Sequence, residues 1–141
     1  MFSTSHKVQF YETDLMGIVH HANYLRFYEE ARVAWAHAKG LIDYQKPGSA
    51  ARFAVLETQV KHHKPTFFGD ELVIRLQAKL VGVRIIFEYE MRVPARENQI
   101  VSVGRTTHVA LDTELKPMRP LPAMLEILEK EQWTETWLSN L

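Results

Sequence analysis

The sequence predicts an α+β domain, with a curved antiparallel sheet of about five strands wrapped around one long helix and a second helix at the C-terminus. Two patterns lead to this fold class. One stretch has apolar residues at helical spacing, and later stretches alternate apolar and polar residues, as half-buried strands do. A sheet and an apolar helix bury their faces against each other in two layers. A chain of 141 residues has the size of one domain, which we place over residues 1–141.

The first two predicted elements are a short strand and the long helix. Residues 6–11 alternate, with Val8 and Phe10 on one side, which indicates a strand. From residue 23 to 39 the period becomes helical, and Gly40 stands where a glycine commonly ends a helix. Apolar side chains at spacings of three, four or seven form one helix face: Tyr24, Phe27, Tyr28, Ala31, Trp35 and Ala38.

The remaining elements follow a predicted loop over residues 43–51. A mixed strand over residues 52–64 ends before Pro65. Three strands with clear alternation follow it, over residues 71–80, 84–93 and 101–111. In the last of them one face carries Val101, Val103, Arg105, Thr107, Val109 and Leu111. Alternation of this kind predicts an antiparallel sheet with one covered face. Short connections predict that the later strands are neighbours in a meander.

The C-terminal segment predicts the end of the sheet and a last helix. Prolines crowd residues 117–122 and stop the final strand. Leu121, Leu125 and Leu128 then recur at helical spacing, and we expect this helix to run past Trp133 and Trp137.

Composition excludes several classes of function. Lys and Arg number 17 and Asp and Glu number 17, so the formal net charge is zero, which argues against nucleic-acid binding. The absence of cysteine excludes disulfides, thiolate metal sites and a cysteine nucleophile. Residues 1–7 lack the apolar stretch of a signal peptide, and no apolar run approaches the roughly 20 residues that span a bilayer. We therefore expect a cytoplasmic protein without membrane insertion.

Residues 11–24 carry the chemistry, because they join the first strand to the predicted helix. A helix N-terminus offers unpaired backbone N–H groups and the positive end of a dipole, which can hold a developing oxyanion. Asp14, placed just before this helix, is suited to attack a carbonyl carbon or to activate water. Taken alone, Asp14 also fits a turn or a helix cap.

This segment resembles a known signature. Asp14-Leu15-Met16-Gly17-Ile18-Val19, followed by His21-Ala22-Asn23-Tyr24, is similar to the motif of 4-hydroxybenzoyl-CoA thioesterases and of their relatives, the Tol–Pal-associated bacterial acyl-CoA thioesterases, which have the hotdog fold. Residues 27–32, 65–72 and 107–112 also look like this family, and the resemblance covers about residues 7 to 125. It implies hydrolysis of acyl-CoA thioesters without a cofactor.

The resemblance also implies roles for single residues. Asp14 would be the catalytic carboxylate, as a nucleophile that forms a mixed anhydride or as a general base toward water, and the sequence leaves both routes open. The backbone N–H of His21 would polarise the thioester carbonyl, and its side chain is a candidate acid, base or positioning group. Asn23 and Glu29 are candidates for orienting these groups.

Coenzyme A would be held by basic side chains. Arg84 aligns with a basic family position that contacts the nucleotide phosphates, and Lys64 and Lys79 are further candidates. Proteins of the family join two subunits through their sheets, with the active site at the seam, so we expect a homodimer or a homotetramer in which Arg84 serves the neighbour's site.

We expect no metal site. Adjacent side chains on a strand point to opposite faces, so His62 and His63 cannot chelate one ion from a regular strand.

Three alternatives remain open at this stage. The same fold is used by acyl-carrier-protein thioesterases and by hotdog dehydratases, and a non-enzymatic acyl-CoA-binding or scaffold protein would share the motif. Hydration of an enoyl thioester, set against release of a free thiol, separates dehydratase from hydrolase. The sequence does not identify the acyl group.

Overall fold

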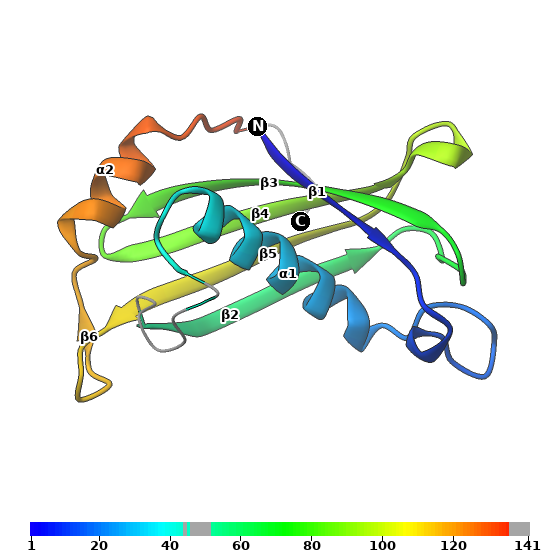
Figure 1. The fold of residues 1–141 in the computed structure, drawn as a ribbon, viewed down its shortest axis with the longest axis horizontal. Coiled ribbons are helices and arrows are strands. Elements are labelled where there is room, and N and C mark those ends of the chain that lie inside the picture. The colour runs from blue at the N-terminus through cyan, green and yellow to red at the C-terminus, as the bar shows by residue number, and fades with distance from the viewer. Residues whose placement is uncertain (44, 46–51, 136–141) are drawn as a thin grey trace.

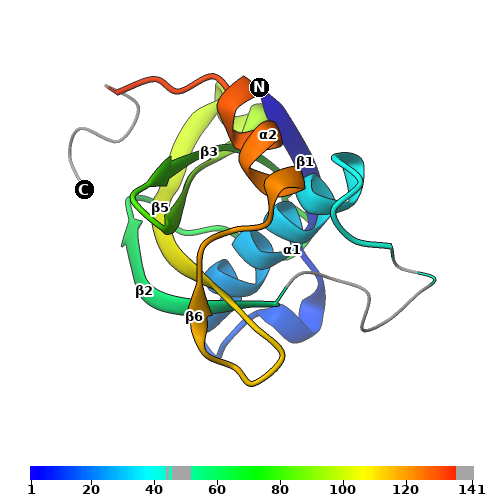
Figure 2. The ribbon, with the colours of Figure 1, turned by 90° about the vertical axis from the view of Figure 1, so that its left-hand side faces the viewer.

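The protein folds into two layers, a curved antiparallel sheet and the long helix α1 (Ala22–Ala38) that the sheet wraps. The computed structural model describes residues 1–43, 45 and 52–135. Figure 1 shows α1 lying along the sheet, and Figure 2 shows the strands curving around it. The strands are β1 (Phe2–Lys7), β2 (Arg52–His62), β3 (Glu71–Val81), β4 (Arg84–Val93), β5 (Gln99–Leu111) and β6 (Pro117–Met118). The predicted α+β class and its sheet wrapped around one helix are confirmed.

The other helices are short. Within the described ranges they are α2 (Pro122–Lys130) and two single 3₁₀ turns, η1 (Phe10–Glu12) and η2 (Pro94–Arg96). In the described part of the chain, no helix has both the length and the apolar character needed to cross a membrane.

The strand order is β1-β3-β4-β5-β2, with β6 added to β5 outside this path. The meander prediction therefore holds for β3, β4 and β5 but is wrong for β2. Strand β2 pairs with β5 at the opposite edge from β1, which occupies the free edge of β3. Residues 63–70 cross from the β2 edge to β3, which lies next to β1 at the other side of the sheet, and Pro65 within them cannot donate to a strand ladder.

The first strand lies earlier than predicted. β1 ends at Lys7, and the expected strand over residues 6–11 instead passes into the turn η1. Val8 is buried, but Phe10 is 75% exposed, so the two do not share a buried face. The buried carboxylate of Glu12 bends the chain here, because its Oε1 accepts from the backbone N–H of Gln9 at 2.7 Å and contacts His6 Nε2 at 2.8 Å.

The C-terminal helix is shorter than predicted. α2 ends at Lys130, so it does not run past Trp133, and Trp137 lies outside the described residues. The chain leaves the helix at Glu131, whose side chain contacts Lys39 Nζ at 2.9 Å. Trp133 then packs under Lys79, whose Nζ lies 4.1 Å from the centre of the ring. The predicted loop over residues 43–51 lies mostly outside the described residues.

The helix α1 begins and ends close to the predicted positions. At its C-terminal end the N–H of Gly40 donates to His37 O at 3.0 Å and the N–H of Leu41 donates to Ala36 O at 2.9 Å. These two bonds form a Schellman cap, which needs a left-handed residue, and Gly40 has φ 78°. A glycine therefore fixes where α1 stops.

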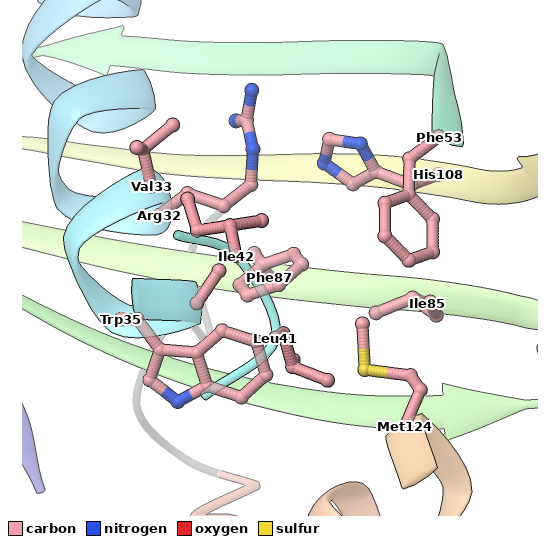
Figure 3. A pocket seen from close by; sticks show the side chains of 11 residues that line it. Arg32, Val33, Trp35, Leu41, Ile42, Phe53, Ile85, Phe87, His108 and Met124 are labelled. Atoms are coloured by element: carbon pink, nitrogen blue, oxygen red, sulfur yellow. The ribbon is translucent and has the colours of Figure 1, made fainter. Parts of the chain in front are cut away.

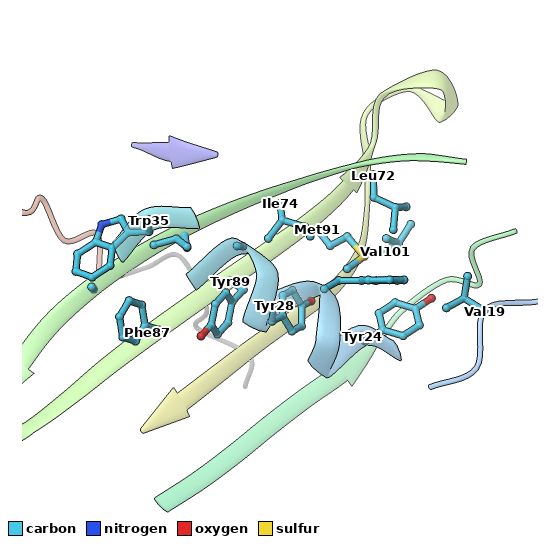
Figure 4. Packing of buried hydrophobic residues seen from close by; sticks show 14 of the residues in the cluster. Val19, Tyr24, Tyr28, Trp35, Leu72, Ile74, Phe87, Tyr89, Met91 and Val101 are labelled. Atoms are coloured by element: carbon cyan, nitrogen blue, oxygen red, sulfur yellow. The ribbon is translucent and has the colours of Figure 1, made fainter. Parts of the chain in front are cut away.

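The core lies between α1 and the concave face of the sheet. From Val19 and Tyr24 at one end to Trp35 and Phe87 at the other, large apolar side chains fill this space (Figure 4). Strand β5 turns its polar residues toward the helix, since the register pairs Ser102, Gly104, Thr106 and His108 with the buried residues of β4. The aliphatic alternation seen in the sequence of β5 lies on its outer face, apart from Val101 at the bulge.

A glycine sets how closely α1 approaches the sheet. A Cβ on Gly104 would stand 2.9 Å from Tyr28 Cε2 and 3.3 Å from the backbone oxygen of Gln59. The Tyr28 ring cannot move away easily, because it is fully buried, stacks on Tyr89 at 4.6 Å and donates its hydroxyl to Ser102 Oγ at 2.6 Å. Only a residue without a side chain fits under this ring.

We predict that Gly104→Ala lowers the free energy of unfolding by about 1–3 kcal/mol, the usual cost of overpacking a core. In a Tyr28→Leu background the same change should cost clearly less, because the ring atoms that the methyl group meets are gone. Urea unfolding of the four proteins of this cycle measures both values. An equal cost in the two backgrounds would show that the Tyr28 ring does not require the glycine.

Candidate active site

A tight hairpin loop presents Asp14 before the start of α1. The N–H of Gly17 donates to Asp14 O at 3.0 Å, and the N–H of Asp14 donates to Ile18 O at 2.8 Å. Gly17 has φ 79°, which side-chain-bearing residues rarely adopt. Aspartate at the first position and glycine at the fourth are typical of such a turn. The Asp-x-x-Gly spacing in the sequence is therefore explained in part by the turn that these residues form.

The carboxylate of Asp14 has one oxygen engaged in the turn. Its Oδ1 accepts from the backbone N–H of Met16 at 2.8 Å. Among the described residues, Oδ2 has no hydrogen-bond partner. The side chain is half-buried and lines a pocket at the end of α1. The turn therefore engages one oxygen of this carboxylate and leaves the other available to a ligand.

The loop is fastened to the helix through the backbone oxygen of Glu12. This oxygen accepts from the backbone N–H of His20 at 2.9 Å and from Asn23 Nδ2 at 2.8 Å. On the other side, the N–H of Val19 donates to Thr66 O at 2.8 Å. Asn23 is buried and does not line the pocket. Asn23 thus joins the loop to α1 through Glu12 O.

The start of α1 leaves one backbone donor unused. His20 Nδ1 accepts from the N–H of Ala22 at 3.2 Å, and His20 O accepts from the N–H of Asn23 at 2.9 Å. In the described part of the chain, the N–H of His21 has no acceptor. The exposed imidazole of His21 also lines the pocket and stacks on His20 at 4.4 Å. An unpaired N–H at the positive end of a helix is suited to an oxyanion.

Asp14, His21 and the end of β2 enclose a pocket of about 500 Å³. Its wall also includes Met16, Ile18, Val19, Tyr24, His62, His63, Lys64 and Pro65. Burial, followed by the nearby His21 and His63, lowers the pKa of His62, which favours its neutral form. The Tyr24 hydroxyl contacts Thr66 Oγ1 at 2.7 Å, and burial raises the pKa of Tyr24, which favours its neutral form.

Besides Asn23, three further predicted site residues lie outside the lining of this pocket. Glu29 is exposed, with Oε2 3.8 Å from Arg32 Nη2, and Lys79 lies near Trp133. The pocket lies level with Met91, since Ser102 pairs with both His62 and Met91. Arg84 is seven positions earlier on β4, roughly 23 Å away at the rise of a strand. Of the three predicted coenzyme A contacts, Lys64 is the one at the pocket.

Met16 and Tyr24 lie within the motif seen in the sequence but were not predicted to have a role in the site, and His62 was not predicted to lie there. His62 was weighed only as a metal ligand, yet it faces Tyr24 with ring centres 4.6 Å apart. The signal that was available is its position at the end of a strand just before Pro65, where the chain turns toward the helix start. Within residues 1–43, 45 and 52–135, no three His, Cys, Asp or Glu side chains are arranged to hold a metal ion.

Comparison with known proteins adds independent findings. Residues 8–129 match the thioesterase-like superfamily. A 1,4-dihydroxy-2-naphthoyl-CoA hydrolase of Nostoc punctiforme is 32% identical over 137 residues, which cover 96% of this chain and 87% of that protein. The acyl-CoA thioester hydrolase YbgC of Escherichia coli is 27% identical over 118 residues, or 82% of this chain and 86% of that one.

A solved structure agrees with this relationship. The crystal structure of a hypothetical protein from Aquifex aeolicus superposes with a TM-score of 0.81 at 29% identity, over 91% of this chain and 99% of that one. The family match and the hotdog architecture thus point the same way. The chain therefore belongs to the thioesterase-like superfamily and is a thioesterase of the hotdog fold.

Proposed function

We propose that the protein hydrolyses acyl-CoA thioesters to a free acid and coenzyme A, with Asp14 as the catalytic carboxylate. One observation carries the proposal: Asp14 and His21 line one pocket at the N-terminal end of α1, and among the described residues Asp14 Oδ2 and the backbone N–H of His21 have no hydrogen-bond partner. A carboxylate beside an oxyanion donor is what attack on a thioester carbon needs. Relatives named as CoA thioester hydrolases favour hydrolysis over dehydration or simple binding.

Two routes use the same atoms. In the first, Asp14 Oδ2 bonds to the carbonyl carbon, the C–S bond breaks, and water then hydrolyses the mixed anhydride. In the second, Asp14 takes a proton from a water molecule that attacks the same carbon. In both, the carbonyl oxygen gains negative charge, which the N–H of His21 and the helix dipole would stabilise. The thiolate of coenzyme A leaves and takes up a proton.

The walls of the pocket support an acyl-CoA substrate. Met16, Ile18 and Val19 offer apolar contact to an acyl group, and Lys64 provides a positive charge for phosphate. Arg84 would contact coenzyme A bound to a neighbouring subunit, as the family resemblance suggests. Closer kinship with the 4-hydroxybenzoyl-CoA and Tol–Pal-associated enzymes is part of this proposal, as is a cytoplasmic location. Thiol release from a panel of aromatic, branched and straight-chain acyl-CoAs identifies the acyl group.

The surface around the site supports a homodimer. β2 is an edge strand, and Val55 and Leu56 on it are each 50% exposed. Leu15, next to Asp14, is fully exposed, and Met16 is 75% exposed. An unpaired strand edge beside exposed apolar side chains favours pairing with a second copy. We infer that the two β2 edges meet and that the Asp14 pockets lie along this seam, in a dimer or in a pair of dimers.

We predict that Asp14→Asn lowers kcat by at least about 100-fold, the usual contribution of such a group, while the protein stays folded. Asparagine keeps the turn, because its side-chain oxygen can still accept from the N–H of Met16. The matched control is Asp112→Asn, since Asp112 Oδ1 likewise holds a turn through the N–H groups of Glu114 and Lys116, far from the pocket. If folded Asp14→Asn retained most of its thiol release, the assignment would be wrong.

We predict that His21→Pro lowers kcat about 10²- to 10³-fold, because proline removes the unpaired N–H. His21 has φ −55°, which proline adopts, and proline is tolerated at helix starts. His21→Ala keeps this N–H and removes only the imidazole. Steady-state kinetics of the two, with thermal unfolding as the folding control, separates the backbone role from the side-chain role. Equal losses in both variants would contradict an oxyanion role for the N–H.

We predict that Val55→Glu combined with Leu56→Glu halves the particle mass measured by light scattering and lowers thioesterase activity, since the site lies at the seam. Val83→Glu, which charges another half-exposed valine in the β3–β4 turn, should leave the mass unchanged. A wild-type particle with the single-chain mass of 16.4 kDa and full activity would rule out the seam.

A further inference from the structure

A second pocket lies at the opposite end of α1 from Asp14. It has a volume of about 230 Å³ and lies between the C-terminal half of the helix and the sheet. Most of its wall is apolar, with Trp35, Leu41, Phe53, Ile85, Phe87 and Met124. It shares no lining residue with the Asp14 pocket. Arg32 on its wall is ten residues past Ala22, about 15 Å along the helix axis.

Two polar side chains interrupt this apolar wall. Arg32 comes from α1 and His108 from β5, and Figure 3 shows both on the same side of the pocket, with Trp35 and Met124 on the other. An apolar pocket with a few convergent polar groups is the usual form of a small-molecule site. The polar pair therefore decides what class of ligand the pocket would take.

Arg32 is a largely buried cation that, among the described residues, has no carboxylate within hydrogen-bond distance. Its side chain is 18% exposed, and its nearest carboxylate is that of Glu29 at 3.8 Å, which is itself 68% exposed. That separation exceeds a hydrogen bond, and such exposed pairs contribute little. Residues 44, 46–51 and 136–141 contain no Asp or Glu, so the undescribed part of the chain supplies no side-chain carboxylate either. A buried guanidinium in this state favours an external anion.

A chain of hydrogen bonds links Arg32 to His108. Arg32 Nη1 donates to the Tyr89 hydroxyl at 3.1 Å, the Tyr89 hydroxyl contacts Thr106 Oγ1 at 2.6 Å, and Thr106 Oγ1 contacts His108 Nε2 at 2.8 Å. If each hydroxyl accepts from the Arg32 side and donates onward, Nε2 is the acceptor of the imidazole. The other ring nitrogen, Nδ1, then carries the proton.

The charge state of His108 agrees with this order. Burial, with a smaller contribution from Arg32, lowers the pKa of His108 to about 4, so the ring is neutral at neutral pH. A neutral imidazole whose Nε2 accepts from Thr106 has one N–H left to donate. The two polar residues that line the pocket thus carry one full positive charge, on Arg32, and one further N–H donor, on His108.

We propose that this pocket is a second ligand site for a compact apolar carboxylate, with the carboxylate on Arg32 and His108 and the ring or branched chain among the apolar side chains. The space is sufficient, since an engineered apolar cavity of about 150 Å³ in another protein binds benzene. The inference does not depend on hydrolysis at Asp14, because the two pockets are separate. A free carboxylic acid would bind in the Arg32 pocket and not in the Asp14 pocket, where hydrolysis would form such an acid.

Benzoate is the probe, and benzamide, which has the same ring without the charge, is its control. Titration calorimetry should show that wild-type protein binds benzoate more tightly than benzamide. Arg32→Met should weaken benzoate binding by on the order of tenfold to a hundredfold, the value of a charged hydrogen bond, with little effect on benzamide. Arg26→Met, which removes an exposed arginine from the same helix, should bind benzoate like the wild type.

A second variant keeps the test valid if Arg32→Met does not fold. Ala36→Leu fills the pocket from the helix side without changing any charge and should abolish binding of both probes. In amide NMR spectra of the wild type, benzoate should shift the signals of Phe87 and His108 and leave those of Asp14 and His21 in place. Absence of benzoate binding, equal binding to folded Arg32→Met, or shifts confined to Asp14 and His21 would each overturn the proposal.

Discussion

The contact between the Tyr28 ring and Gly104 sets the geometry on which the rest of the structure depends. Because β5 has no side chain at this position, the ring lies directly on the strand and its hydroxyl reaches Ser102. The helix is thereby held deep in the concave face of the sheet, and its first turn is placed beside the end of β2. The site at the helix mouth and the Arg32 pocket near its other end are both consequences of this one close approach.

At the N-terminal end of α1, the residues that stabilise the loop are also the residues to which we assign the chemistry. Asp14 holds its turn through Oδ1 and leaves Oδ2 free, while His20 Nδ1 accepts from the N–H of Ala22 and the N–H of His21 has no acceptor among the described residues. Asn23 secures the loop to the helix through the backbone oxygen of Glu12. Asp14 and His21 therefore each meet a folding requirement of this segment and, in our proposal, a catalytic one.

Much of the fold could be predicted from the sequence, because periodicity reports burial directly. The limits of α1 and β4 followed from apolar spacing and from Gly40. The misplaced first strand has a different cause: Glu12 is a buried carboxylate that bends the chain, and alternation of apolar and polar residues does not reveal side-chain bonds such as the one between Glu12 and His6. The covered face of β5 was equally hidden, since polar residues on it are matched by hydroxyl groups from the helix and from β4.

The candidate site also has one part that could be predicted from the sequence and one part that could not. Asp14 and His21 came from one continuous motif, so their meeting in one pocket needed only local structure. His62 and Lys64 come from the end of β2, and pairing of β2 with β5, which short connections did not indicate, brings them there. Arg84 was placed by resemblance, and in a single chain it lies at the far end of its strand. Contacts that depend on a second subunit cannot be read from the pattern of one chain.

The most direct test is a crystal structure with an acyl-CoA analogue that has a methylene group between the carbonyl and the sulfur and so cannot be hydrolysed. The account predicts its carbonyl carbon about 3–3.5 Å from Asp14 Oδ2 and its oxygen about 2.7–3.1 Å from the backbone nitrogen of His21. An analogue bound with its carbonyl away from both groups would contradict the account.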